Sequence, residues 1–456
     1  MKKSKNLKII PVLLFASSIL LTSCKSGGKK DGLVFYVWGD TVEISLYEKV
    51  ASEFSKLTGI KVSVQHPSDD YYNNLSISLS SKDNAPDIFF TEAGEFNGHI
   101  QSNTLLNLSP YIENGTIDIK SAQNPNGSIE LWPINDTYRF DGEKVGSGDY
   151  YALIKDWSTD FVLWYNKDHI DQYNEENDLE EGDDDFMEYP SETVPMSWNQ
   201  FLDMSKKLTK ANRYGTMLDR VPYKHVFEWI QMSGSSPWID NKYFNSTDPN
   251  VYKAFKFFKD LQVGDKASAP LSTATSAIGS GNAFANGQLS FAFFGNWAYS
   301  SYNWDSVSFN IGICPPPVNK SNPKEKDTYA ASASMVALSV YKKSKMKDEA
   351  AQFINYYMNE GQKVMANKGF NIPGNKLIAN SDIFLRPDDA FLGKINKYFL
   401  NIAEKYSHSL EFNSYLTQET VESAMQKHLS VHFLNPNQKD LQTVLNDIAD
   451  EIKKKI

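Results

Sequence analysis

The chain has 456 residues, of which 41% are hydrophobic and 22% charged, so it can bury a large core that we expect to be divided between two lobes. A formal net charge of -10 at pH 7 argues against nucleic acid or an anionic membrane surface as a general partner. Aromatic residues make up 13% of the chain, a content that suits core packing and a carbohydrate-binding surface equally well.

The first 23 residues predict an export signal. Lys2, Lys3 and Lys5 precede an apolar run, residues 9 to 21, that is too short for a membrane-spanning helix. The run ends at Leu21-Thr22-Ser23-Cys24, which resembles a bacterial lipobox, in which the cysteine is lipidated and the chain is cut just before it. We therefore interpret residues 1–23 as a lipoprotein signal peptide and Cys24 as the lipidation site. Ordinary signal cleavage beside an incidental cysteine is the alternative.

The residues after Cys24 are typical of a tether. Residues 24–32 are small, polar and charged, as in a flexible linker. No later run of about 18 or more apolar residues occurs, so the N-terminal lipid would be the only contact with the membrane. The second cysteine, Cys314, would then have no partner for an internal disulfide. We expect an extracytoplasmic protein, lipid-anchored to the cell membrane at the cell surface or in the periplasm.

The exported part opens with a strand, a helix and a strand. Leu33 to Trp38 is a continuous apolar run, as in a strand covered on both faces. Apolar residues then recur at helical spacing from Ile44 to Leu57, and Gly59 is a helix C-cap candidate. Residues 60–64 alternate as a second strand. This order predicts a βαβ unit in a parallel sheet.

A second unit follows directly. Residues 71–81 suit a helix, residues 83–86 a turn and residues 87–90 a short buried strand that ends at Thr91 and Glu92. Ligands of open parallel sheets bind beyond the carboxyl ends of the strands. We therefore expect Trp38, Gly39 and Asp40 to face the same crevice as Thr91 and Glu92.

Further helices are predicted downstream. Ser197 and Gln200 form a capping box, with a hydrophobic staple between Met196 and Phe201. Residues 346–368 predict two consecutive helices interrupted near Gly361. Residues 395–407 and 439–454 also suit helices, while Trp229 lies on an apolar helix face typical of a core. The fold class is α/β with two lobes.

Seven segments in fixed order carry a family resemblance. They are EFSKLTGIKVSV (53–64), APDIFF (85–90), NTLLNLSPYI (103–112), VLWYNKDHI (162–170), PMSWNQFLDMSKKL (195–208), AFANGQLSFAFFGNWAYSSY (283–302) and NKGFNIPGNK (367–376). Together they resemble the extracellular solute-binding proteins of sugar-importing ABC transporters, of the maltose-binding-protein type. The resemblance implies a two-lobed periplasmic-binding-protein-like fold of type II, in which each lobe is a mixed sheet flanked by helices and the ligand cleft lies at the hinge. It places lobe 1 at residues 32–157 plus 313–345, and lobe 2 at 158–312 plus 346–456.

The resemblance implies a binding module rather than an enzyme. We expect a monomer without a cofactor or catalytic residues, whose partners are a carbohydrate ligand and the permease subunits of an ABC transporter. The alternative is a surface-anchored glycoside hydrolase or polysaccharide lyase with paired carboxylates. A third hypothesis is an adhesin that kept the fold and lost transport, and a glycerol phosphodiester is an alternative solute.

A sugar site combines an aromatic plate for the ring face with polar groups for the hydroxyls. Trp38, Gly39 and Asp40 meet this requirement from lobe 1, although Asp40 equally suits a helix N-cap. The resemblance adds Thr91, Glu92 and Glu95, where the maltodextrin-binding branch has ligand contacts; the two glutamates equally suit solvated loop charges.

The resemblance also implies contacts from lobe 2 and the hinge. Gly295, Trp297 and Tyr299 match the segment whose aromatics stack on sugar, with core packing as the alternative for Trp297. Trp157 and Thr159 are hinge candidates, but Thr159 replaces the usual acid of the family, for which Asp160 is a substitute. Phe370 and Asn371 lie in a late loop where stacking and plain packing are both open.

No metal site is predicted. The acidic stretch 178–185 does not follow the alternating order of an EF-hand, which favours a solvated, mobile loop over a calcium site. The seven histidines are scattered and include no His-Glu-x-x-His pair, so zinc is not expected.

Overall fold

The computed structural model describes residues 32–68, 70–81, 85–218, 223–264, 267–270, 279–298, 307–319, 331–369, 371–409, 411–429 and 439–456. The signal peptide, the tether with Cys24, and the predicted ligand contacts Tyr299 and Phe370 lie outside these ranges. Residues 32–456 form one compact unit.

A seven-stranded mixed sheet forms the first half of the fold, with strand order β14-β6-β13-β3-β1-β2 and β15 paired to β13. Its strands are β1 (Leu33–Tyr36), β2 (Val62–Gln65), β3 (Ile88–Glu92), β6 (Ala152–Thr159), β13 (Ala331–Val340), β14 (Ile372–Pro373) and β15 (Ser407–Ser409). β1 pairs with β2 and β3 in parallel, whereas β13 runs antiparallel to both β3 and β6. The predicted βαβ unit is therefore confirmed.

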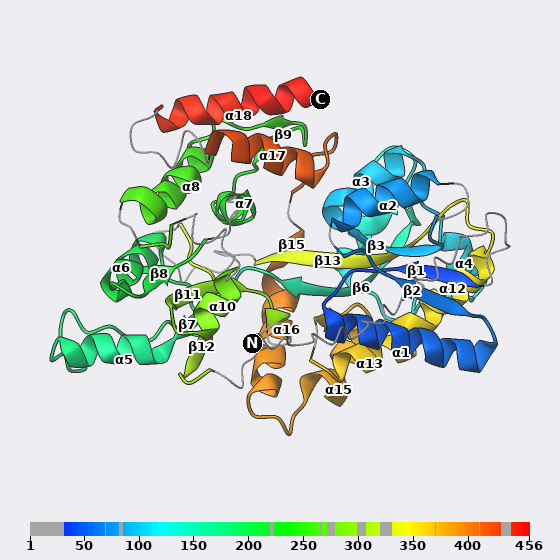
Figure 1. Ribbon diagram of the computed structural model, residues 1–456, viewed down its shortest axis with the longest axis horizontal. Coiled ribbons are helices and arrows are strands. Elements are labelled where there is room, and N and C mark those ends of the chain that lie inside the picture. The colour runs from blue at the N-terminus through cyan, green and yellow to red at the C-terminus, as the bar shows by residue number, and fades with distance from the viewer. Residues whose placement is uncertain are drawn as a thin grey trace, which may run out of the picture. The chain divides into compact units, whose positions relative to one another are not determined.

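Helices cover both faces of this sheet. On one face lie α2 (Tyr71–Ser80) and α3 (Ala93–Gln101), and on the other lie α1 (Thr41–Thr58) and a long helical run (Figure 1). That run consists of α12 (Lys347–Tyr356), the π-helical turn η4 (Tyr357–Gly361) and α13 (Gln362–Ala366). Aromatic rings fill the space between the layers, because Phe35 of β1 lies 5.2 Å from Phe353 and 6.0 Å from Tyr357. Smaller elements complete this half: α4 (Ser109–Glu113), η1 (Pro133–Tyr138), β4 (Arg139–Phe140), β5 (Asp149–Tyr150), α14 (Lys376–Ala379) and α15 (Asp382–Leu385).

A four-stranded sheet forms the second half, with strand order β12-β7-β11-β8. Its strands are β7 (Val162–Asn166), β8 (Tyr214–Thr216), β11 (Leu289–Phe294) and β12 (Ile311–Cys314). The helices of this half are α5 (Lys167–Glu176), α6 (Trp198–Leu208), α7 (Tyr223–Met232), α8 (Pro249–Lys259), η2 (Asp260–Gly264), α10 (Gly279–Ala285), α17 (Gln418–His428) and α18 (Leu441–Lys455). A short hairpin, β9 (Trp238–Ile239) and β10 (Tyr243–Phe244), lies beside α18 (Figure 1). Trp198 stacks on Phe257 at 4.7 Å, and Trp229 is fully buried, as predicted for a core residue.

The predicted start of α6 is confirmed. The Ser197 side chain accepts a hydrogen bond from the Gln200 backbone, and the Gln200 side chain accepts one from the Ser197 backbone. The predicted interruption near Gly361 is the π-helical turn η4, through which the helix continues. No helix in the described ranges is both long and apolar enough to cross a bilayer.

Residues 347–385 lie with the seven-stranded sheet, whereas the sequence analysis placed them in lobe 2. η4 contacts α1, α12 contacts β13, and the Asn355 side chain accepts a hydrogen bond from the Asp118 backbone at 3.0 Å. Helical periodicity predicts that this segment buries one face, but it does not say which sheet that face covers. The chain returns to the second half only after α16 (Leu392–Tyr406), where α17 and α18 pack on each other and α18 packs on α8.

Gly312 of β12 is expected to be essential for packing in the second sheet. It lies opposite Tyr165 of β7, and a Cβ atom at this position would collide with the Tyr165 ring. Gly312→Ala should therefore lower the free energy of unfolding by about 1–3 kcal/mol, measured by chemical denaturation. Gly98→Ala is the control, because it lies on an exposed part of α3 where a Cβ atom finds space; equal stability of the two variants would contradict the packing.

Candidate functional site

The carboxyl ends of β1 and β3 lie side by side, as the sequence predicts. Phe35 pairs with Ile88 and Tyr36 with Phe89, so Trp38, just after β1, and Glu92, the last residue of β3, lie at the ends of neighbouring parallel strands. The half-buried Trp38 ring packs edge-on against Tyr71 at 4.5 Å and lies 6.0 Å from Tyr72. The Tyr72 hydroxyl in turn donates to Glu92 Oε2 at 2.7 Å. Trp38 and Glu92 are thus joined through one tyrosine.

Asp40 caps α1. Its Oδ1 accepts hydrogen bonds from the backbone of Val42 at 2.8 Å and of Glu43 at 2.9 Å. Glu43 Oε2 completes the capping box by accepting from the Asp40 backbone at 3.1 Å. The described residues offer no hydrogen bond to Asp40 Oδ2. A cap and a ligand contact are therefore compatible at this residue, because they can use different oxygens.

Gly39 permits this close turn. A Cβ atom at Gly39 would lie 2.8 Å from the Glu43 Cβ atom, well inside normal contact distance. The absence of a side chain leaves the backbone after Trp38 open to close approach. Burial raises the pKa of Glu43, and the nearby Lys155 opposes that rise.

The three predicted contacts at the end of β3 have different environments. The fully buried Thr91 hydroxyl is engaged with the Ser339 hydroxyl at 2.8 Å, within the sheet. Glu92 is half-buried and accepts from Tyr72. Burial, followed by the carboxylates of Glu92, Glu419 and Glu422, raises the pKa of Glu95 to about 7.

α3 and α17 meet at this end of β3. A Cβ atom at Gly94 would lie 2.5 Å from Gln418 Oε1, so glycine allows the start of α3 to approach α17 closely. The Asn97 and Gln101 side chains donate to the Ser414 carbonyl at 2.6 and 3.0 Å. The three acidic side chains that act on Glu95, those of Glu92, Glu419 and Glu422, therefore come from both halves of the fold.

β6 contains a β-bulge that creates a buried ion pair. Ile154 pairs with Ala337 and Asp156 pairs with Val336, which leaves Lys155 as the extra residue. The bulge allows the side chains of these sequence neighbours to meet, and Lys155 Nζ forms a buried ion pair with Asp156 Oδ2. Lys155 Nζ also donates to the Tyr47 hydroxyl at 3.2 Å and lies 4.7 Å above the Phe90 ring.

Buried polar atoms without a hydrogen-bond partner gather at the end of β6. Trp157 is 2% exposed and Thr159 is 0% exposed, and the described residues offer no partner to Trp157 Nε1 or Thr159 Oγ1. Trp157 packs edge-on against Trp132 at 5.1 Å. Asn371 donates to Asp156 Oδ1 at 3.4 Å, while its own Oδ1 has no partner among the residues that the structure describes. Such unpaired groups are costly in a protein interior unless something else satisfies them.

The end of β11 meets the end of β6. Trp297 is half-buried, and its Nε1 donates to Asp160 Oδ1 at 2.7 Å; Asp160 also accepts from the Ser158 hydroxyl. A Cβ atom at Gly295 would lie 2.5 Å from Trp297 Nε1, so glycine is needed for this contact. Asn296 is 1% exposed, and neither polar atom of its side chain has a partner within the described ranges.

β13 lies between the two groups of residues. Glu92 pairs with Val336 on one side of β13, and Thr159 pairs with Ala333 on the other. The two positions are offset by three residues, or about 10 Å along the strand. The structure therefore brings the candidates from β1 and β3 and those from β6 and β11 to the same region.

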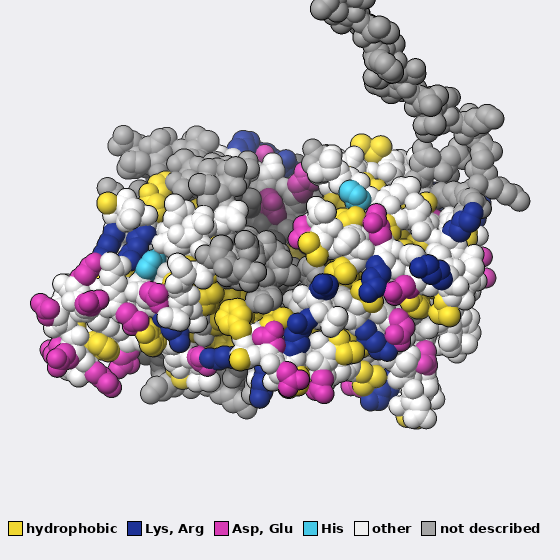
Figure 2. All heavy atoms as spheres, turned by 60° about the horizontal axis from the view of Figure 1, so that its bottom comes forward, with side chains coloured by type: hydrophobic (Ala, Val, Ile, Leu, Met, Phe, Trp, Pro, Cys, Tyr) yellow, Lys and Arg dark blue, Asp and Glu magenta, His cyan; other side chains and the backbone are white. Residues whose placement is uncertain are grey.

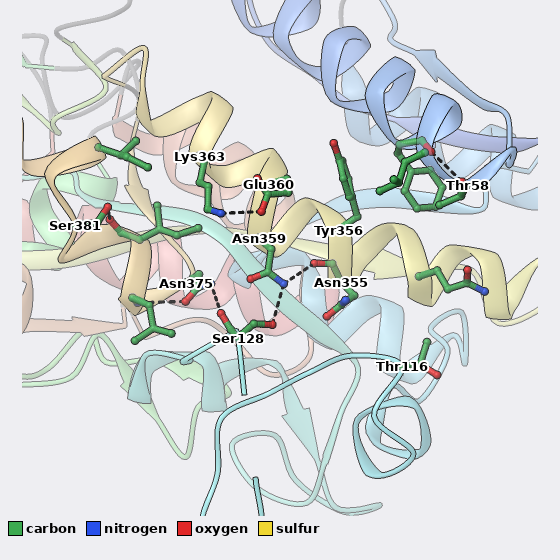
Figure 3. Close-up of a pocket in the computed structure, with 16 residues that line it drawn as sticks. Thr58, Thr116, Ser128, Asn355, Tyr356, Asn359, Glu360, Lys363, Asn375 and Ser381 are labelled. Carbon is green, nitrogen blue, oxygen red and sulfur yellow. Dashed lines mark hydrogen bonds and ion pairs between the residues drawn. The ribbon is translucent and has the colours of Figure 1, made fainter. Parts of the chain in front are cut away.

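A pocket of about 700 Å³ lies elsewhere, beside α1 and η4 (Figure 3). Its amide side chains already link neighbouring segments: Asn359 donates to the Ser128 hydroxyl at 3.1 Å, and Asn375 donates to the Ser128 carbonyl at 2.9 Å. No sequence-predicted site residue lines it. The described residues also contain no group of three or more His, Cys, Asp or Glu side chains that could hold a metal ion.

The sequence pattern of the bacterial extracellular solute-binding proteins matches residues 38–364, well over half of the chain. This chain belongs to that family. The matched range includes the candidate residues from Trp38 to Trp297, whereas Asn371 lies beyond it. The resemblance seen in the sequence is therefore confirmed. The family consists of transporter binding proteins rather than enzymes, which confirms the expected non-enzymatic role.

Solved structures share the fold of this solute-binding protein at low sequence identity. An ABC substrate-binding protein from Listeria monocytogenes in complex with cycloalternan has 20% identity and a TM-score of 0.73, over 93% of this chain and 98% of that one. The maltotriose-binding protein of Thermus thermophilus, bound with maltotriose, has 18% identity and a TM-score of 0.67, over 92% and 99%. UgpB from Mycobacterium tuberculosis in complex with glycerophosphocholine has 15% identity and a TM-score of 0.70, over 94% and 98%. The predicted two-lobed α/β fold is confirmed.

Sequence reasoning missed several residues of the candidate site. Tyr72 joins Trp38 to Glu92, and Asn296 carries unpaired polar atoms beside Trp297. The sequence contained a pattern that could have revealed the Lys155–Asp156 pair, since two adjacent charged residues interrupt an otherwise apolar strand. No sequence pattern singled out Asn296 or Tyr72, because polar residues in such loops and aromatic residues in such helices are common.

Replacement of Asp40 separates its two roles. Asp40→Ala removes the cap and should lower the free energy of unfolding by about 1 kcal/mol without any solute, measured by chemical denaturation. Asp40→Asn keeps an oxygen acceptor and should stay close to the wild-type stability. A solute contact through the Asp40 carboxylate would weaken solute-induced stabilisation in both variants, including Asp40→Asn, whose stability without solute stays close to that of the wild type. Wild-type stability of Asp40→Ala would contradict the observed cap.

Glu95 should make stability depend on pH. Its folded-state pKa of about 7 exceeds the ordinary value of 4.5, so the folded protein binds a proton before the unfolded chain does. The free energy of unfolding should therefore rise as the pH falls from about 8 to about 5. Glu95→Gln should reduce this rise and should increase the melting temperature at pH 8 by about 1–3 °C. Parallel pH profiles of wild type and Glu95→Gln would refute the assignment, with exposed Glu48→Gln as the control.

Proposed function

We propose that this solute-binding protein captures a sugar or oligosaccharide between its two lobes and delivers it to the permease subunits of an ABC importer. The Trp297 ring with its polar surroundings is the observation that carries the proposal. Asp160 fixes the edge of the indole, and the unpaired groups of Asn296 and Thr159 lie on the same two strand ends. An aromatic face with free hydrogen-bonding groups matches the chemistry of a pyranose ring.

The proposed contacts divide between the two halves. Trp38, Gly39, Asp40, Glu92 and Glu95 would contribute from the ends of β1 and β3. Thr91 from the end of β3, Trp157 and Thr159 from the end of β6, and Phe370 and Asn371, which precede β14 in the chain, would add contacts from the same half. Gly295, Trp297 and Tyr299, which follow β11 in the chain, would contribute from the second half. A ligand that contacts both groups favours the state in which they are close, so its differential affinity would drive closure.

Two structural neighbours support the choice of solute class. Those from Listeria monocytogenes and Thermus thermophilus hold cycloalternan and maltotriose, whereas the neighbour from Mycobacterium tuberculosis holds glycerophosphocholine. We also propose that the mature chain is anchored by a lipid on Cys24, which would keep the captured solute near the permease.

Thermal-shift screening tests the solute class. We expect one class of mono- or oligosaccharide to raise the melting temperature. Chromatography of the same samples should show that the sugar is unchanged. Trp297→Ala should weaken the affinity for that sugar about 30-fold, or about 2 kcal/mol, by isothermal titration calorimetry. Tyr243→Ala, which truncates an exposed aromatic side chain of β10, is the matched control.

The screen also identifies the failure of the proposal. Stabilisation by glycerophosphocholine and by no sugar would reassign the solute class. If the sugar raised the melting temperature of Trp297→Ala as much as that of the wild type, the Trp297 ring would not belong to the site. Release of sugar products would contradict a binding role.

A further inference from the structure

A second surface feature shares no residue with the candidate solute site. A groove of about 910 Å³ runs between residues 184–197 and the exposed side of α6. Acidic side chains gather over α5 and the loop that follows it, at the left end of the view in Figure 2. This loop includes the acidic stretch 178–185, to which the proposed solute-binding function gives no role.

The floor of the groove is apolar. Met187 and Met196 are buried, and Phe186 and Met204 are half-buried. Tyr189 is 46% exposed at the edge. Methionine side chains adapt their shape to different apolar partners, so this floor suits the insertion of a large apolar side chain.

The rim of the groove is negatively charged. Four carboxylates line it, those of Asp184, Asp185, Glu188 and Asp203, against the single ammonium of Lys207. Lys207 is already shared, at 3.4 Å from Asp185 and 3.2 Å from Asp203. Asp184 and Glu188 are exposed and form no ion pair within the described ranges. Two carboxylates on the rim are therefore available to a cation from outside.

The wall of the groove is held in place by specific contacts. The buried Asn174 side chain forms two hydrogen bonds with the Met187 backbone, donating to its carbonyl at 3.0 Å and accepting from its amide at 2.9 Å. The Tyr189 hydroxyl donates to Asp171 at 2.5 Å, and the Tyr165 hydroxyl donates to the Pro190 carbonyl at 3.4 Å. A preformed wall reduces the entropy lost when a partner binds.

We propose that this groove docks a segment of a partner protein in which lysine or arginine side chains flank a large apolar residue. The apolar residue would enter the methionine floor, and the cations would pair with Asp184 and Glu188 on the rim. Charge complementarity selects this partner, because an acidic or uncharged segment would leave the rim carboxylates unpaired. The proposal is independent of the solute site, since no residue of that site lines the groove.

A labelled peptide tests the docking groove. We would titrate the purified protein into the blocked peptide Lys-Lys-Leu-Leu-Lys-Lys and follow fluorescence anisotropy. We expect saturable binding with a dissociation constant between about 1 µM and about 1 mM, which weakens as salt is added. The peptides Glu-Glu-Leu-Leu-Glu-Glu and Lys-Lys-Ser-Ser-Lys-Lys should not bind, because each lacks one of the two complementary features.

Paired charge variants locate the binding. Asp184→Asn with Glu188→Gln should weaken peptide binding about fivefold or more, whereas Asp178→Asn with Glu181→Gln should change it less than twofold. Both double variants remove the same charge from the same loop, but only the first pair lines the groove. Equal losses in the two double variants would reduce the effect to general electrostatic attraction and overturn the proposal.

Other occupants would also overturn it. Loss of peptide binding in 1 mM calcium chloride, together with stabilisation by calcium, would make the loop a cation site. Concentration-dependent association in sedimentation velocity that the Asp184→Asn, Glu188→Gln variant abolishes would identify a second copy of this chain as the occupant. Absence of saturable peptide binding up to 1 mM would likewise reject the docking groove.

Discussion

The antiparallel pairing of β6 with β13 is the constraint on which the candidate site depends. β13 joins β3 on one side and β6 on the other, so it fixes the distance between Glu92 and Thr159. β6 then continues almost directly into β7 of the second sheet. The bulge at Lys155 lies within this pairing and places a buried ion pair against Tyr47 of α1. One strand pair thus joins the first helix, both strand-end groups and the second sheet.

Local patterns in the sequence predicted the helices and strands better than they predicted which sheet each helix packs against. The alternation in residues 60–64 and the helical period from Ile44 to Leu57 depend on burial of one face. The strand and the helix both form, with Ile44 to Phe54 of the period buried and Val62 and Val64 half-buried, but Leu57 is 73% exposed. The proximity of the ends of β1 and β3 could also be predicted, because parallel strands place their carboxyl ends together. Which sheet residues 347–385 would cover depended on complementary aromatic surfaces, with Phe353 against Phe35 and Phe54, and no local pattern encodes such a match.

The positions of the candidate residues in the fold were easier to predict than their side-chain partners. Trp38, Asp40 and Trp297 come two to four residues after the ends of β1 and β11, where sequence reasoning could find them. The sequence did not reveal that the Thr91 hydroxyl is engaged with Ser339, or that Asp160 binds the Trp297 indole. These contacts join residues more than 130 positions apart, and they depend on sheet register rather than on spacing. The sequence suggests Asp160 as a substitute for the acid that the family usually has at the position of Thr159. Its observed partner is Trp297, an aromatic residue of the proposed site.

The short connection between β6 and β7 would couple the proposed binding of a solute to any movement between the two sheets. Only Asp160 and Phe161 separate β6 from β7, and the Phe161 ring stacks on Phe293 of β11 at 4.4 Å. A rotation of one sheet against the other must pass through the backbone dihedrals of these residues, and it carries along the carboxylate that orients the indole. The joint and the aromatic plate therefore cannot vary independently. A substitution at Asp160 that changed the solute specificity would at the same time change how easily the two sheets rotate against each other.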